Sequence, residues 1–223
     1  MKIKTSNIMH AYRPLTPSSV STSPDGKFFA ATNFQGDLAI YDVDQKDPVF
    51  VVRDAHGPTA IEEAQKMSQM TGFPAVVVPA VSWCPDGRQL ATLGADRRIV
   101  VWNWDNDSRS LTATGHEWRD ADAAIEAELN ARAEVLQQEV SNLTDPTKIM
   151  GTNLELQNIN FQLAKPRSLG LLMEPDGNHV MTFGDRIRRW EISTGQLIEE
   201  LNDHHAEISV AAFKDGLLAT GSI

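Results

Sequence analysis

An internal repeat constrains the fold of this chain more than any other feature of its sequence. The segment Pro85–Trp102 reads PDGRQLATLGADRRIVVW, and Pro24–Tyr41 repeats its pattern 61 residues earlier. A shorter third copy spans Pro175–Trp190, and Asp215–Ser222 repeats the front half once more. A chain that repeats one sequence unit several times folds into neighbouring copies of one structural unit.

Each copy reads as a series of short strands separated by turns. An Asp-Gly pair after Pro24, Pro85 and Pro175 lies between short apolar runs, which is a strong signal for a β-hairpin. A second turn precedes the segments Ile99–Trp102 and Ile187–Trp190. With one further strand after each of these runs, the pattern predicts units of four antiparallel strands.

These residues resemble the WD40 repeat family, whose fold is a β-propeller of four-stranded blades. The segment His204–Ser222 is similar to the opening of a blade, and Trp102 and Trp190 match the tryptophan that closes the family motif. The dipeptide that names the family occurs here as Tyr41-Asp42, Trp102-Asn103 and Trp190-Glu191. The resemblance implies an all-β propeller with about 3.5 blades, interrupted by helical insertions.

The resemblance also implies a buried hydrogen-bond chain in each blade, made by a histidine, a threonine, a turn aspartate and the tryptophan. We interpret these residues as structural, because a buried Asp or His must be paired and no nucleophile completes the set. The residues implied are His56, Thr92, Asp96 and Trp102 in blade two, and His116, Thr182, Asp185 and Trp190 in blade three.

The first insertion lies between blades one and two. Thr59-Ala60-Ile61-Glu62 has the pattern of a capping box, and Gly72-Phe73-Pro74 is a stop signal, so we expect a short helix between them. Ile61, Ala64, Met67 and Met70 share one side of that helix, and we expect this side to pack against the rim of a blade.

The second insertion is longer and predicts a helical arm. Good helix formers fill 120–140, Asp145-Pro146 ends the run, and apolar residues between Leu154 and Leu163 can fold back over the helix. Leu129, Leu136 and Leu143 lie seven apart as in a coiled coil, although Arg132 and Glu139 interrupt the seam. Residues that could contact a partner protein are Trp118, Ile125, Leu129 and Leu136, the last three only if the arm leaves them exposed.

Charge and composition narrow the function. The formal net charge is −10, which disfavours nucleic acid, and we interpret Arg97, Arg98 and the arginines at 186–189 as solvated edges. No apolar run approaches 18 residues, so we expect no membrane span and a cytoplasmic protein. The one cysteine, Cys84, excludes an internal disulfide and is interpreted as a buried filler.

No motif of catalysis or cofactor binding is present in the sequence. His204 and His205, with Asp203 and Glu207, could bind a metal ion, but the blade-opening interpretation of His204 is stronger, so we expect no catalytic, cofactor or metal site. We expect a non-catalytic scaffold that binds other proteins. The alternatives are a sensor segment of a larger enzyme such as a kinase or NTPase, and a propeller with its own activity.

We expect the chain to be part of a larger ring, and self-association through an open blade edge or through the arm is a further expectation. The predicted units are an N-terminal extension at 1–17, blade one at 18–53, a helical insert at 54–75, blade two at 76–114, the long helical arm at 115–167, blade three at 168–203 and the start of blade four at 204–223.

Overall fold

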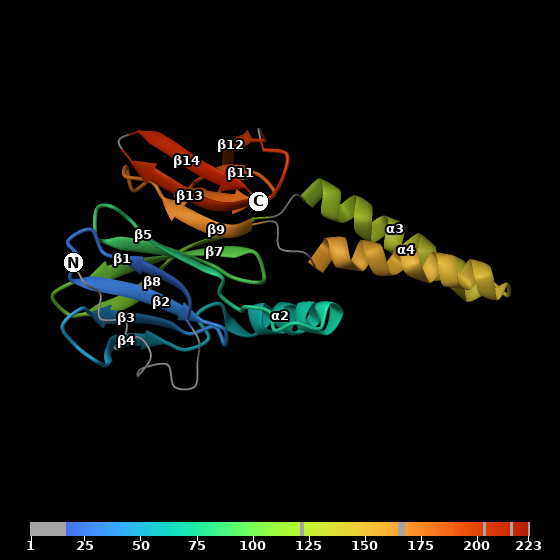
Figure 1. The fold of residues 1–223 in the computed structure, drawn as a ribbon, viewed down its shortest axis with the longest axis horizontal. Helices are drawn as coiled ribbons and strands as arrows, with labels where there is room; N and C mark the ends of the chain where they lie inside the picture. Colours follow the sequence, from blue (N-terminus) through green and yellow to red (C-terminus); the bar gives the residue numbers. More distant parts are fainter. Residues whose placement is uncertain (1–16, 121–122, 165–167, 203, 215, 223) are drawn as a thin grey trace.

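The computed structural model describes residues 17–120, 123–164, 168–202, 204–214 and 216–222. Three four-stranded antiparallel sheets and a two-stranded hairpin lie side by side, and three helices extend from one side of them (Figure 1). The predicted N-terminal extension lies outside the described residues, except for Pro17.

Each sheet is built from consecutive strands in chain order. Blade one comprises β1 (Pro17–Thr22), β2 (Phe28–Asn33), β3 (Leu38–Asp42) and β4 (Pro48–Val52). Blade two comprises β5 (Ala80–Trp83), β6 (Gln89–Leu93), β7 (Arg98–Asp105) and β8 (Ser110–Arg119). Blade three comprises β9 (Ser168–Met173), β10 (His179–Gly184), β11 (Ile187–Glu191) and β12 (Leu197–Leu201), and the last hairpin is β13 (Ile208–Lys214) with β14 (Leu217–Ser222).

The predicted Asp-Gly turns join the first two strands of each blade. Gly26, Gly87 and Gly177 have φ of 70°, 77° and 68°, a conformation that L side chains rarely adopt. In each turn the glycine N–H donates to the carbonyl three residues earlier, at Ser23, Cys84 or Glu174. The repeat therefore places glycine where the backbone of this hairpin requires it.

The core lies between the sheets. All six residues of β2 and all four of β5 are buried, as expected for strands covered on both faces. Phe28 and Trp83 meet Trp104 edge-on between blades one and two, with ring centroids 5.3 and 6.1 Å apart. Leu171, Met173 and Trp190 belong to the cluster between blades two and three, and Ile208 closes a third cluster against blade three. Burial of such side chains is worth about 1.5–3 kcal/mol each.

Helix α2 (Gly57–Thr71) fills the first insertion, but the predicted capping box is wrong. The helix begins before Thr59, with His56 at its N-cap and Pro58 in its first turn, where a proline loses no hydrogen bond. The stop at Gly72 is as predicted, since its φ is 74° and its N–H donates to the carbonyl of Ser68. Ala64 and Ile61 pack against Val77 and Val78 as expected, whereas Met70 is exposed.

Blade two differs from the prediction at its last strand. Strand β8 continues through Gly115 and His116 to Arg119, and Trp118 pairs with Ile99 of β7. A bulge between Val100 and Trp102 lets the strand bend and stay paired. His116, which the resemblance assigns to blade three, is therefore part of the last strand of blade two.

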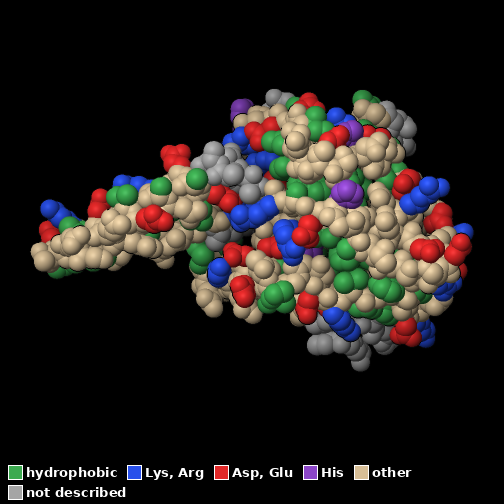
Figure 2. Space-filling model, turned by 180° about the vertical axis from the view of Figure 1, so that it is seen from behind, with side chains coloured by type: hydrophobic (Ala, Val, Ile, Leu, Met, Phe, Trp, Pro, Cys, Tyr) green, Lys and Arg blue, Asp and Glu red, His purple; other side chains and the backbone are tan. Residues whose placement is uncertain are grey.

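Helices α3 (Ala123–Asn142) and α4 (Pro146–Ala164) form an antiparallel hairpin, which we call the arm. It projects away from the blades on the same side as α2 (Figures 1 and 2). The fold-back predicted for 154–163 is present, because Leu156, Ile159 and Leu163 pack against Leu129, Ala133 and Leu136 of α3.

Candidate functional site

The hydrogen-bond chain implied for blade two is assembled in the structure. His56 Nε2 lies 2.8 Å from Thr92 Oγ1, and Trp102 Nε1 donates to the same hydroxyl at 2.9 Å. Asp96 Oδ1 lies 3.5 Å from His56 Nδ1. Burial alone would raise the pKa of Asp96, but the neighbouring His56 and hydrogen bonds from Arg98 hold it below its ordinary value. Because Thr92 is fully buried, no substrate can reach its hydroxyl, and the chain serves to stabilise the blade.

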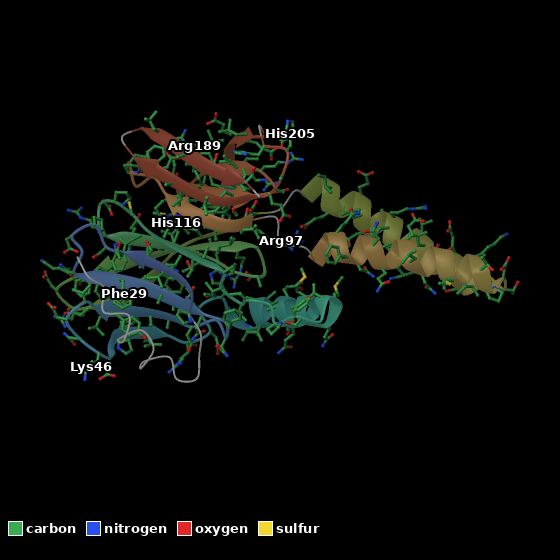
Figure 3. The ribbon with its side chains drawn as sticks, in the orientation of Figure 1. Phe29, Lys46, Arg97, His116, Arg189 and His205 are labelled. Atoms are coloured by element: carbon green, nitrogen blue, oxygen red, sulfur yellow. The ribbon has the colours of Figure 1, made fainter. Side chains whose placement is uncertain are left out.

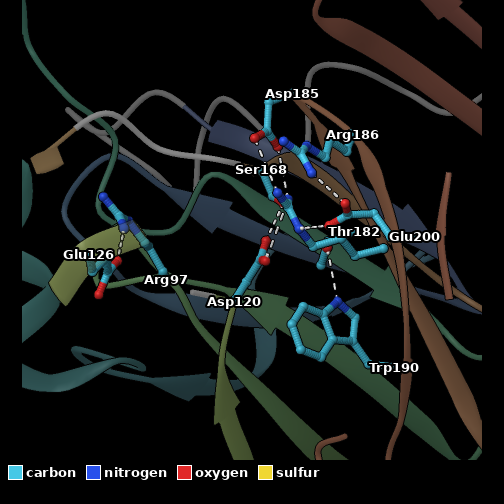
Figure 4. Close-up of polar contacts among 10 residues, drawn as sticks. Arg97, Asp120, Glu126, Ser168, Thr182, Asp185, Arg186, Trp190 and Glu200 are labelled. Carbon is cyan, nitrogen blue, oxygen red and sulfur yellow. Dashed lines mark hydrogen bonds and ion pairs between the residues drawn. The ribbon is translucent and has the colours of Figure 1, made fainter. Parts of the chain in front are cut away.

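In blade three the implied chain contains an aspartate in place of the histidine. Trp190 Nε1 donates to Thr182 Oγ1 at 3.0 Å, but His116 lies on β8 and is exposed, so its assignment to this chain is wrong (Figures 3 and 4). The buried group facing Thr182 is Asp120, which also accepts the hydroxyl of Ser168. Burial raises the pKa of the Asp120 carboxyl.

The sequence pattern does not single out Asp120, because His116 lies four residues before it and matches the histidine of the family motif. A readable signal existed, since His56 directly precedes α2 and Asp120 lies just before α3. Asp120 is joined to the blade by Arg188, whose Nη1 lies 3.6 Å from its Oδ1 and 2.8 Å from Asp185 Oδ1. Asp185 therefore belongs to an ion-pair cluster that includes Arg188 and Glu200 (Figure 4).

The last hairpin repeats the histidine–threonine contact. His204 Nε2 lies 2.7 Å from Thr220 Oγ1, which is the arrangement of His56 and Thr92. Asp203, part of the alternative metal cluster, lies outside the described residues. Elsewhere, Glu174, Asp176 and His179 offer ligand atoms within 4.8 Å of one another. Arg189 occupies that position instead, because it binds both oxygens of Glu174 at 2.7 and 2.9 Å.

The interpretation of the arginines as solvated edges is wrong for Arg97 and Arg188, which are 5% and 4% exposed. Arg97 lies at the base of the arm (Figure 3) and donates to the carboxylate of Glu126 on α3 (Figure 4). It also donates to the carbonyl of Leu163 on α4. Arg119 Nη1 binds the other oxygen of Glu126 at 3.0 Å. One turn of blade two thus binds both helices of the arm.

The four predicted contact residues have different positions. Trp118 lies on β8 and not in a loop, and its ring packs against Trp190 with centroids 6.5 Å apart. Leu136 is 1% exposed and Leu129 is half-buried, so both belong to the core of the arm. Ile125 is 37% exposed.

A second apolar surface of the arm was not anticipated. On α4, Met150, Leu154 and Phe161 are 76%, 67% and 42% exposed. Leu154 and Phe161 line a hollow of about 650 Å³ together with Met70 of α2, Gly151 and Gln157, and we call this hollow the α2–α4 groove. The sequence signal was the spacing of the apolar residues 150, 154 and 161, although Met70 precedes them by at least 80 residues and only the fold brings it close to Leu154 and Phe161.

Across the described helices, none combines the length and apolarity needed to cross a membrane. With the sheets, turns and buried hydrogen-bond chains described above, the chain is built of WD40-type propeller blades, which confirms the predicted fold class.

Comparisons with known proteins agree with that class. The family described as "WD domain, G-beta repeat" matches residues 67–103. COMPASS component SWD1 of Saccharomyces cerevisiae is 28% identical over 115 residues, which are 48% of this chain and 24% of the yeast protein. The chain therefore spans about a quarter of the length of this curated relative.

Solved structures show the same fold at lower identity. The β-propeller domain of Myceliophteria thermophila Cps50 (Swd1) matches with a TM-score of 0.55 at 13% identity, over 99% of this chain and 55% of that one. The RRP9 WD40 repeats and U3-55K each match with a TM-score of 0.50 at 11% identity, over 87% of this chain and 41% of theirs.

Proposed function

We propose that this chain is a non-catalytic scaffold that binds other proteins, with the arm and the neighbouring α2 as its contact surface. The single observation that carries the proposal is a rigid propeller frame from which a helical hairpin projects with exposed apolar side chains (Figure 1). A relative is named as a component of COMPASS, which supports assembly with other proteins.

The attachment of the arm supports a positioning role. Arg97 is buried and binds α3 and α4 together, so the base of the arm is fixed relative to blade two. A contact surface held rigidly loses little conformational entropy when a partner binds.

The polar clusters among the described residues support a non-catalytic role. Thr92 and Thr182 lie fully buried in their blades, and Arg189 neutralises the acidic group at Glu174. The net charge of −10 disfavours phosphate backbones as partners. A cytoplasmic location and self-association through a blade edge stay predictions of the sequence.

Affinity capture from the source cells tests the proposal. The full-length protein is compared with a variant in which 123–164 is replaced by a short Gly-Ser linker, and circular dichroism and thermal unfolding verify that the blades of the variant still fold. We expect the variant to lose a defined set of the partners that quantitative mass spectrometry finds with the wild type. Retention of every partner by a folded variant would contradict the proposal.

A further inference from the structure

Helix α4 is apolar on two nearly opposite faces, and only one of them is covered. Leu156, Ile159 and Leu163 pack against α3. Met150, Leu154 and Phe161 fall on the other side, because two residues along a helix correspond to a rotation of about 200°. A helix with apolar stripes on both sides is typical of the inside of a bundle, so α4 is built to receive another element.

The uncovered face has the shape of a helix-binding groove. Its apolar residues Met150, Leu154 and Phe161 recur at spacings of four and seven residues, as on one side of a coiled-coil seam, and the polar Gln157 lies between the last two. These positions span about 16 Å, or three helical turns. Met70 at the end of α2 forms the opposite wall, and the hollow between them has a volume of about 650 Å³.

The charge around the groove favours a basic amphipathic helix over an acidic one as the partner. Residues 123–164 contain six acidic and two basic side chains, and α2 contains two acidic and one basic. Acidic side chains lie along the arm in Figure 2, and Glu155, which Arg132 of α3 binds at 2.8 Å, lines the groove itself. A second copy of this chain would bring the same negative charge to the contact, whereas a basic helix would be attracted.

We propose that the α2–α4 groove binds a basic amphipathic helix of a partner protein, with the partner's apolar stripe on Met70, Leu154 and Phe161. The inference rests on the proposed scaffold function and deepens it by assigning the contact to one face of the arm. Recognition follows the helix-in-groove mode, in which apolar anchors supply affinity and flanking charges supply the preference for partner.

The test uses the full chain and three synthetic peptides of about 18 residues. The first carries leucines at the i, i+4, i+7 and i+11 positions of a helix with lysines on its polar face. The second has glutamate at every lysine position, and the third has the residues of the first in scrambled order. Fluorescence anisotropy measures their binding to the wild type, to Leu154→Gln/Phe161→Gln and to the control Val135→Gln, an exposed residue of α3 outside the groove.

We expect the lysine peptide to bind the wild type and Val135→Gln equally. Leu154→Gln/Phe161→Gln should weaken it by about tenfold or more, because two apolar anchors are lost. The glutamate and scrambled peptides should bind more weakly than the lysine peptide. Helix content measured by circular dichroism confirms that both variants keep the arm folded.

Three results would overturn the inference: no binding of the lysine peptide, equal binding by both variants, or equal binding of the glutamate peptide. A wild-type dimer in sedimentation velocity that Leu154→Gln/Phe161→Gln abolishes would assign the groove to a second copy instead. If the peptides fail while removal of the arm still costs the protein its cellular partners, the scaffold function stands and only the groove assignment falls.

Discussion

Replacement of Arg97 by alanine should release the arm from blade two. The guanidinium of Arg97 is buried and binds both Glu126 and the carbonyl of Leu163. Removal of one member of a buried ion pair costs about 3–5 kcal/mol, because the other charge is left without compensation. Glu126 keeps Arg119 at 3.0 Å, so its charge stays partly compensated and we expect a smaller cost, about 2–4 kcal/mol.

Hydrogen exchange followed by mass spectrometry measures where this cost appears. Protection should fall in the first turns of α3 and the last turns of α4, while the strands of blade two keep theirs. Arg109→Ala is the matched control, since Arg109 also has a positive φ (50°, against 64° for Arg97) but makes an exposed ion pair with Asp42. The control should cost less than about 1 kcal/mol. Equal exchange in the wild type and Arg97→Ala would refute the anchoring role.

Three further predictions concern the blades. Thr92→Val removes the hydroxyl shared by the histidine and the tryptophan of blade two, so thermal unfolding should show that the free energy of unfolding falls by about 2–4 kcal/mol. The control Thr112→Val, at an exposed position, should change it by less than about 0.5 kcal/mol. Equal effects of the two substitutions would contradict the structural role of Thr92. Asp120→Asn and Asp96→Asn should have opposite pH dependence in melting experiments. The pKa of Asp120 is raised, so the wild type loses stability as pH rises above the ordinary value of 3.8, and Asp120→Asn should become more stable relative to the wild type over that rise. The pKa of Asp96 is lowered, so the Asp96 carboxylate stabilises the wild type at neutral pH, and this advantage over Asp96→Asn should shrink as pH falls below 3.8. The same sign for both variants would refute this assignment. Burial raises the pKa of Cys84 to about 11, so Ellman's reagent at neutral pH should modify it only at the rate of unfolding; rapid modification of the folded protein would contradict its burial.

Most of the fold could be predicted from the repeat, because each blade is formed by strands that are neighbours in sequence. The Asp-Gly turns and apolar runs of Pro85–Trp102 specify strands that pair with their neighbours in sequence, and neighbouring blades then pack through their apolar faces. Short-range patterns are sufficient for such a fold.

The predictions from the sequence were wrong where segments that are distant in sequence meet in the fold. His116 has the sequence context of a blade opening, but a bulge keeps β8 paired through Arg119 and leaves the buried position to Asp120. Arg97 resembles a solvated turn residue until α3 and α4 cover it. Leu129 and Leu136 are as apolar as the residues on the exposed face of α4, so the sequence does not distinguish buried from exposed apolar residues of the arm. The packing of α4 against α3 shows that Leu129 and Leu136 are on the buried side.

Cross-linking mass spectrometry of the native complex, captured through the full-length protein, tests whether partner proteins bind at the α2–α4 groove. Lys66 on α2 and Lys148 on α4 lie on the helices that form the groove, whereas Lys46 lies at the far end of blade one (Figure 3). We expect partner cross-links at Lys66 and Lys148, to segments of partner chains that are basic and helical. Partner cross-links confined to Lys46 and the blades, with Lys66 and Lys148 unmodified by any partner, would contradict it.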